Sequence, residues 1–126
     1  MSNSDNGLFG VDIANGLKIL NNNTAIYVRL LNSFTQNKLY SELLEAVENN
    51  DGTGFAEKSH ALKGVCANLR LEELFSVAKD LDGMAKAGIT PTAGDPKVGE
   101  LKLAYDKTLA SVQKIIADPS ILDSYK

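Results

Sequence analysis

The chain has 126 residues, 44% hydrophobic and 23% charged, which suits one globular domain with a single core. Its 13 basic and 16 acidic residues are dispersed and give a net charge of −3, which excludes a basic footprint for nucleic acid or a membrane surface. The single cysteine excludes an intramolecular disulfide, and no apolar run approaches the ~20 residues that span a bilayer. The polar start, 1–7, lacks the features of a signal peptide. We therefore expect a cytoplasmic protein with a disordered N-terminus at 1–7.

Apolar residues recur at spacings of three and four along most of the chain, which predicts amphipathic helices. A short first helix is expected between Leu8 and Leu20, and a second one starts at a cap on Asn23 or Thr24. A break near 35–37 separates the second helix from a third. The apolar positions of these two longer helices are Ile26, Leu30, Leu31 and Phe34, then Leu39, Leu43, Ala46 and Val47.

A strong turn signal at 49–54 precedes a helix that runs to about Leu69. The next helix is predicted to begin near Leu71 and to stop at Gly88. The pair 95–96, an N-cap residue followed by proline, starts a final long helix that ends before the last proline of the chain. The inward-facing residues of these last two helices are expected to be Leu74, Ala78, Leu81 and Ala85, then Val98, Leu101, Tyr105, Leu109, Val112 and Ile116.

No alternating strand pattern, internal repeat or linker interrupts this series of helices. The prediction is an all-α protein, a mostly antiparallel four-helix bundle with one or two additional short N-terminal helices. The bundle is expected to occupy 8–118, and 119–126 forms a C-terminal tail. We expect a monomer, because no exposed apolar stripe is evident.

The helix that follows the 49–54 turn displays the only histidine of the chain on its outer face. Its buried stripe consists of residues at spacings of three and four, and His60 points roughly 160° away from Leu62 in that stripe. Lys63, three residues further on, lies within side-chain reach of the imidazole. The predicted buried stripe is Phe55, Ser59, Leu62, Cys66 and Leu69.

Gly64 shares this outer face, although glycine inside a helix costs roughly 1 kcal/mol relative to alanine. Internal packing gives an outward-facing glycine no purpose, whereas close approach of another molecule to the histidine does. The small side chains of Ala56 and Ala67 add little bulk to the same face. The pattern therefore favours a flat surface around His60 on which a second molecule docks.

Imidazole is a neutral nucleophile near pH 7, with an ordinary pKa of about 6.5. A hydrolase would also need an orienting acid and an oxyanion site, but the outer face offers only Glu57 and Lys63 nearby. A metal site is not expected, because Cys66 faces the core. A phosphoryl acceptor needs only an exposed nitrogen, room for a partner and a cation such as Lys63. An interaction-only bundle in which His60 is incidental, and a histidine-dependent enzyme, remain as alternatives.

The segment 60–69, HALKGVCANL, resembles the His-x-Leu-Lys-Gly-x-x-x-Asn signature of histidine-containing phosphotransfer (HPt) domains. The resemblance covers roughly residues 8–88. It extends through Gly16, Leu17, Tyr27, Leu31 and Phe34 upstream, and through Leu74, Ala78 and Leu81 downstream.

The resemblance implies that His60 takes a phosphoryl group from a receiver aspartyl phosphate or from a histidine kinase, and passes it to a receiver aspartate. Lys63 would steady the phosphate, and Gly64 would let the receiver dock closely. The chain would have no independent turnover, no metal and no cofactor, since Mg²⁺ would belong to the partner receiver domain. The partner-docking residues would be Ala56, Glu57, Ala67, Arg70 and Lys86.

Two positions depart from the family pattern. Arg70 stands where the family usually has a helix-ending glycine, so it either alters the turn or adds a cation beside the docking surface. Asp82 stands where the family often has glutamate. Lys79, Asp82 and Lys86 share one stripe of the next helix, which we interpret as a solvated face, with Lys86 as the candidate for a further basic site residue.

Overall fold

The computed structural model describes residues 8–126, so the disorder predicted for 1–7 lies outside the described residues. Within this range the chain is all-helical, which confirms the predicted class, and an isolated bridge between Val11 and Leu71 is the sole β pairing. None of the helices over residues 8–126 is long and apolar enough to cross a membrane. The elements are α1 (Ile13–Ile19), α2 (Thr24–Gln36), α3 (Leu39–Glu48), α4 (Gly52–Leu69), α5 (Glu72–Lys86), α6 (Pro96–Ala117) and the 3-10 helix η2 (Pro119–Tyr125).

Side-chain caps begin four of the helices. The predicted caps at Asn23, within the 49–54 turn and at Asp95 are confirmed, and each cap of this kind contributes about 1 kcal/mol. The capping side chains accept hydrogen bonds from backbone N–H groups two or three residues ahead. They belong to Asp12, Asn23, Asp51 and Asp95.

Residues 8–12 bind the turn between α4 and α5 instead of forming the first turn of α1. The N–H of Asp12 donates to the carbonyl of Arg70 at 2.9 Å, and the N–H of Glu72 donates to the carbonyl of Gly10 at 2.7 Å. Because these backbone groups are engaged with the turn, the helix predicted from Leu8 begins only at Ile13.

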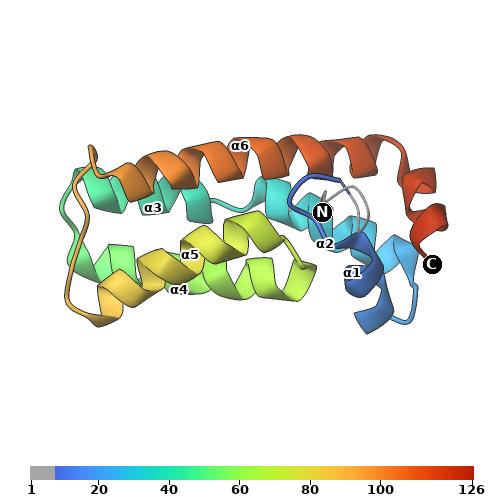
Figure 1. The fold of residues 1–126 in the computed structure, drawn as a ribbon, viewed down its shortest axis with the longest axis horizontal. Coiled ribbons are helices and arrows are strands. Elements are labelled where there is room, and N and C mark those ends of the chain that lie inside the picture. Colours follow the sequence, from blue (N-terminus) through green and yellow to red (C-terminus); the bar gives the residue numbers. More distant parts are fainter. Residues whose placement is uncertain (1–7) are drawn as a thin grey trace.

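The helices form a bundle-like arrangement around one core (Figure 1). Helices α4 and α5 pack against each other as a hairpin, α3 packs on α4, and α6 contacts both α5 and α2. Figure 1 shows α2 and α3 following one another along the length of α6, with α1 and η2 at one end. The largest fully buried side chains include Tyr27, Phe34, Phe55, Leu62, Leu81 and Leu101.

The apolar stripe predicted for α2 is confirmed at Leu31 and Phe34 and wrong at Ile26 and Leu30. Ile26 and Leu30 are each 38% exposed, whereas Tyr27, Leu31 and Phe34 are buried. Tyr27 is drawn inward because its hydroxyl donates a buried hydrogen bond to the carbonyl of Leu69, at 3.1 Å. The buried face of α2 is therefore centred on an aromatic residue with a specific polar partner.

The C-terminal part of the chain differs from the prediction in two ways. The buried face of α6 is shifted, since Tyr105, Leu109 and Ile116 are only partly buried while Ile115 is fully buried. The segment predicted as a tail, 119–126, includes η2, whose Leu122 is fully buried. This short helix contacts α1, α2 and α6, and so closes one end of the core.

Candidate functional site

Helix α4 displays His60 to solvent because its opposite face is held in the core. The predicted buried stripe is confirmed, from Phe55 through Leu62 to Leu69. The imidazole side chain is 68% exposed, so its predicted outward orientation is also confirmed. Most of the side chain of the chain's only histidine is thus open to solvent.

Gly64 stands in open space one turn beyond His60. A Cβ atom added to Gly64 would meet no heavy atom within 4 Å, so no internal packing requires a glycine there. On the same helix Ala67 and Glu57 are exposed and Ala56 is half-buried. The surface around His60 therefore carries little side-chain bulk, as the sequence predicts. The lower helix stability that a mid-helix glycine causes is not offset by any packing within the described residues.

Asp82 of α5 lies at the centre of the site, which the sequence analysis did not predict. Its side chain is 5% exposed and has three partners on two helices. Lys63 Nζ donates to Asp82 Oδ2 at 2.7 Å, and Lys86 Nζ lies 2.9 Å from the same oxygen. His60 Nδ1 lies 3.4 Å from Asp82 Oδ1. We call these four residues, His60, Lys63, Asp82 and Lys86, the His60 cluster.

The two lysines keep Asp82 ionised despite its burial. The hydrogen bond from Lys63, followed by that from Lys86, holds the pKa of the Asp82 carboxyl far below its ordinary range. The same contact raises the pKa of Lys86. With His60 neutral, two ammonium groups and one carboxylate give the cluster a formal charge of +1.

The position of Asp82 corrects two expectations. The stripe that carries it is not simply a solvated face, because Asp82 is buried between α4 and α5 while Lys79 and Lys86 are exposed. The acid beside His60 is also Asp82, whereas the sequence indicated only Glu57 nearby. A sequence signal did exist: Asp82 directly follows Leu81 at the edge of the apolar stripe, four residues before a lysine.

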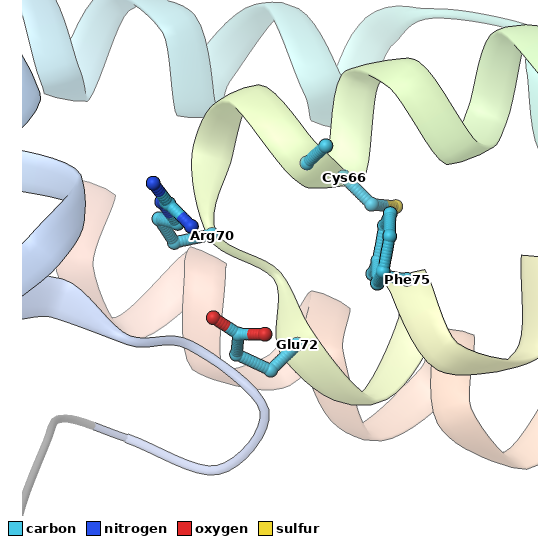
Figure 2. A pocket seen from close by; sticks show the side chains of 5 residues that line it. Cys66, Arg70, Glu72 and Phe75 are labelled. Carbon is cyan, nitrogen blue, oxygen red and sulfur yellow. The ribbon is translucent and has the colours of Figure 1, made fainter. Parts of the chain in front are cut away.

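Arg70 preserves the turn that a glycine would make. It ends α4 in the left-handed conformation, with φ of 58°, which residues other than glycine seldom adopt. The end of α4 therefore has the backbone conformation that a glycine commonly supplies, with an arginine in its place. Figure 2 shows Arg70 beside a small pocket of about 70 Å³, which Cys66, Glu72 and Phe75 also line.

Arg70 stands apart from the His60 cluster. Ten residues of α-helix separate it from His60, a distance of about 15 Å along the axis of α4. Its Nε is buried and has no hydrogen-bond partner. Of the predicted docking residues, Lys86 thus belongs to the cluster, whereas Arg70 marks the far end of the same helix.

A second surface feature is an apolar hollow between α1, α2 and α4. It measures about 430 Å³, and its lining includes Ile19, Leu30 and Val65. Ile19 is 53% exposed and Leu30 38% exposed, so the expectation that no apolar stripe reaches the surface is wrong here. Such a hollow suits the apolar side chains of a partner protein.

The remaining candidate ligands do not converge. Over residues 8–126 no group of three or more His, Cys, Asp or Glu side chains is arranged to hold a metal ion. Cys66 is buried, and burial raises the pKa of its thiol to about 12. It therefore stays protonated and enclosed at neutral pH.

Comparisons with family models, curated proteins and solved structures found no match for this chain. Function is therefore inferred from the geometry of the His60 cluster and from the motif that contains His60. That geometry combines an exposed imidazole, a carboxylate facing one ring nitrogen, two nearby ammonium groups and open space one helical turn away.

Proposed function

We propose that this chain is a histidine-containing phosphotransfer domain in which His60 carries a phosphoryl group between signalling partners. In this proposal α2 and α3 together count as one broken helix, which with α4, α5 and α6 forms a four-helix bundle extended by α1. The partners are response-regulator receiver domains, a sensor histidine kinase, or both, and the domain acts as a cytoplasmic monomer without nucleic acid or membrane.

The observation that carries the proposal is the placement of Asp82 against His60 Nδ1, at 3.4 Å. A carboxylate on that side favours the tautomer with its proton on Nδ1, so the lone pair of the imidazole lies on Nε2. The His60 side chain is 68% exposed, and in this proposal Nε2 is the nitrogen that meets the partner. The arrangement suits a nucleophile that must reach an atom held by another protein.

In the accepting step, Nε2 attacks the phosphorus of an aspartyl phosphate. The N–P bond forms as the bond between phosphorus and the aspartyl oxygen breaks, and the receiver carboxylate leaves. Nδ1 keeps its proton, which the Asp82 carboxylate stabilises, and the reverse step returns the phosphoryl group to a receiver aspartate. Lys63 and Lys86 offset the added negative charge, and the proposal needs no metal on this chain, since Mg²⁺ would be held by the receiver.

The docking surface of this proposal is the low face of α4 together with its neighbour α5. Gly64 permits close approach, and Lys86 lies where a partner would cover the His60 cluster. Ala56, Glu57, Ala67 and Arg70 complete the surface along the length of α4.

The test uses the purified chain and a panel of phosphorylated receivers and histidine kinases. We expect an acid-labile, alkali-stable phosphoryl label on the wild-type chain and none on a His60→Gln variant, which should fold normally because His60 is exposed. If no cognate partner from the same genome labels the wild-type chain at His60, the phosphotransfer function is wrong.

The apolar hollow favours one alternative, a helical-bundle adaptor that binds an apolar helix of a signalling partner without being phosphorylated. In that case His60→Gln would leave partner binding and signalling unchanged. The Asp82–His60 pair is the one feature that favours a histidine-dependent enzyme. Stoichiometric labelling of the chain, without multiple turnover of a phosphate ester, separates a relay domain from such an enzyme.

A further inference from the structure

Three groups converge on the one carboxylate of Asp82, and two of them are the cations that a phosphoryl group on His60 would need. Lys63 and Lys86 both contact Asp82 Oδ2, at 2.7 Å and 2.9 Å. In the unphosphorylated chain these ammonium groups are therefore already occupied. Any contact that these ammonium groups make with a phosphoryl group weakens their ion pairs with Asp82.

Phosphorylation would place a second anion at the same cations. A phosphoryl group adds a charge of about −2, and Asp82 contributes −1 from a side chain that is only 5% exposed. The two lysines supply +2 and the ring, which keeps its Nδ1 proton, supplies +1, so the phosphorylated cluster is only just balanced and the two lysines must serve two anions at once. The flexible lysine stems allow redistribution, because the side chains of Lys86 and Lys63 are 64% and 24% exposed.

Resting on the proposed function, we infer that Asp82 competes with the phosphoryl group for Lys63 and Lys86 and thereby sets the position of the transfer equilibrium. Its carboxylate raises the free energy of phosphorylated His60, so the phosphoryl group is more readily returned to a receiver aspartate. Asp82 has two roles. It is a positioning residue that favours one tautomer of the His60 ring, and its negative charge disfavours the phosphoryl group on His60.

These two roles have different thermodynamic signatures. The ring that carries a phosphoryl group on Nε2 and keeps its proton on Nδ1 is cationic, so the Nδ1 contact with Asp82 favours phosphorylated His60 and its loss moves the partition toward the receiver. Competition for the lysines disfavours phosphorylated His60, so its loss moves the partition toward His60. The direction of the shift in the equilibrium partition therefore tells which of the two roles of Asp82 dominates.

The experiment measures that partition for wild type and Asp82→Asn, approached from both directions with the same receiver. We expect the variant to shift the equilibrium toward phosphorylated His60 by roughly tenfold. This is well below the effect of unit charges several ångströms apart at an effective dielectric constant near 20, because solvent screens the exposed Lys86 and the lost Nδ1 contact acts in the opposite direction. Asp80→Asn is the matched control on α5, because Asp80 is exposed and pairs with Lys97 instead. Asp80→Asn should leave the partition at the wild-type value.

Lys86→Gln provides a second variant that keeps the test decisive if Asp82→Asn unfolds. Lys86 is exposed and its loss removes one of the two cations, so the partition should move away from His60 by several-fold. Lys114→Gln on α6 carries the same charge change on another exposed helix position and should have no effect.

An unchanged partition in the folded Asp82→Asn variant would overturn the inference, as would a shift away from His60. If Lys86→Gln moves the partition toward His60, the competition is also refuted. Failure of the underlying function looks different, because the wild-type chain itself would then acquire no label.

Discussion

Gly64→Gln should separate partner docking from fold stability. The substitution is expected to raise the free energy of unfolding and to lower the rate of phosphoryl transfer. A Cβ atom at Gly64 meets nothing within 4 Å, so the glutamine side chain has room in the isolated domain. Replacing a mid-helix glycine by a good helix former raises the free energy of unfolding by about 0.5 kcal/mol. A partner that approaches closely over Gly64 would instead meet a side chain one turn from His60.

The expected loss in transfer is large, since misplacing reacting groups by about 1 Å can lower a rate by roughly 100-fold. Rapid-quench measurement of phosphoryl transfer from a phosphorylated receiver gives this rate, and urea unfolding gives the stability. Gly99→Gln is the matched control, because Gly99 lies in α6 and is equally open. It should gain the same stability and transfer at the wild-type rate.

Transfer by Gly64→Gln at the wild-type rate would refute the reasoning, because close approach would then not require a bare backbone at this position. Loss of stability in the same variant would show that the surface around Gly64 is not open. A slow but fully stable variant, beside an unaffected Gly99→Gln, is the result that close docking predicts.

Three further predictions concern the fold. Gly16→Ala should lower the free energy of unfolding by about 3 kcal/mol in urea titrations, because its Cβ would lie 2.7 Å from the buried Tyr27 hydroxyl that bonds to Leu69. Arg70→Gly should raise it by about 1 kcal/mol, since glycine adopts a φ of 58° without strain; a loss would show that the arginine stem matters more. The lowered pKa of Asp82 contributes stability that is complete above the ordinary value of 3.8 and is lost as the pH falls further. Acid titration from pH 4 to pH 2 should therefore destabilise wild type more steeply than Asp82→Asn, and equal slopes would contradict this.

Much of the fold was predictable, because each helix of the hairpin carries its own signals. The buried stripe of α4, its cap and its end near Leu69 follow from residues close together in sequence. The outward orientation of His60 and Gly64 follows from the same periodicity. Features that depend on one helix and its cap are accessible without knowledge of the tertiary structure.

The features that sequence reasoning missed depend on how two helices meet. Asp82 sits at the edge of the apolar stripe of α5, where a carboxylate faces either solvent or the neighbouring helix. Only the register of α5 against α4 decides this, by bringing Lys63 to 2.7 Å. For a similar reason the predicted buried face of α2 wrongly included Ile26 and did not include Tyr27, because the partner of the Tyr27 hydroxyl lies 42 residues away in the chain.

All four residues of the His60 cluster come from one hairpin, α4 and α5, within a single stretch of sequence. The apolar hollow, by contrast, is lined by α1 and α2 on one side and by the C-terminal part of α4 on the other. Substitutions on its α1 and α2 side, such as at Ile19 or Leu30, therefore change the hollow without touching His60 or its charged neighbours. If the proposed function holds, binding at the hollow and phosphoryl transfer at His60 can be altered separately by substitution.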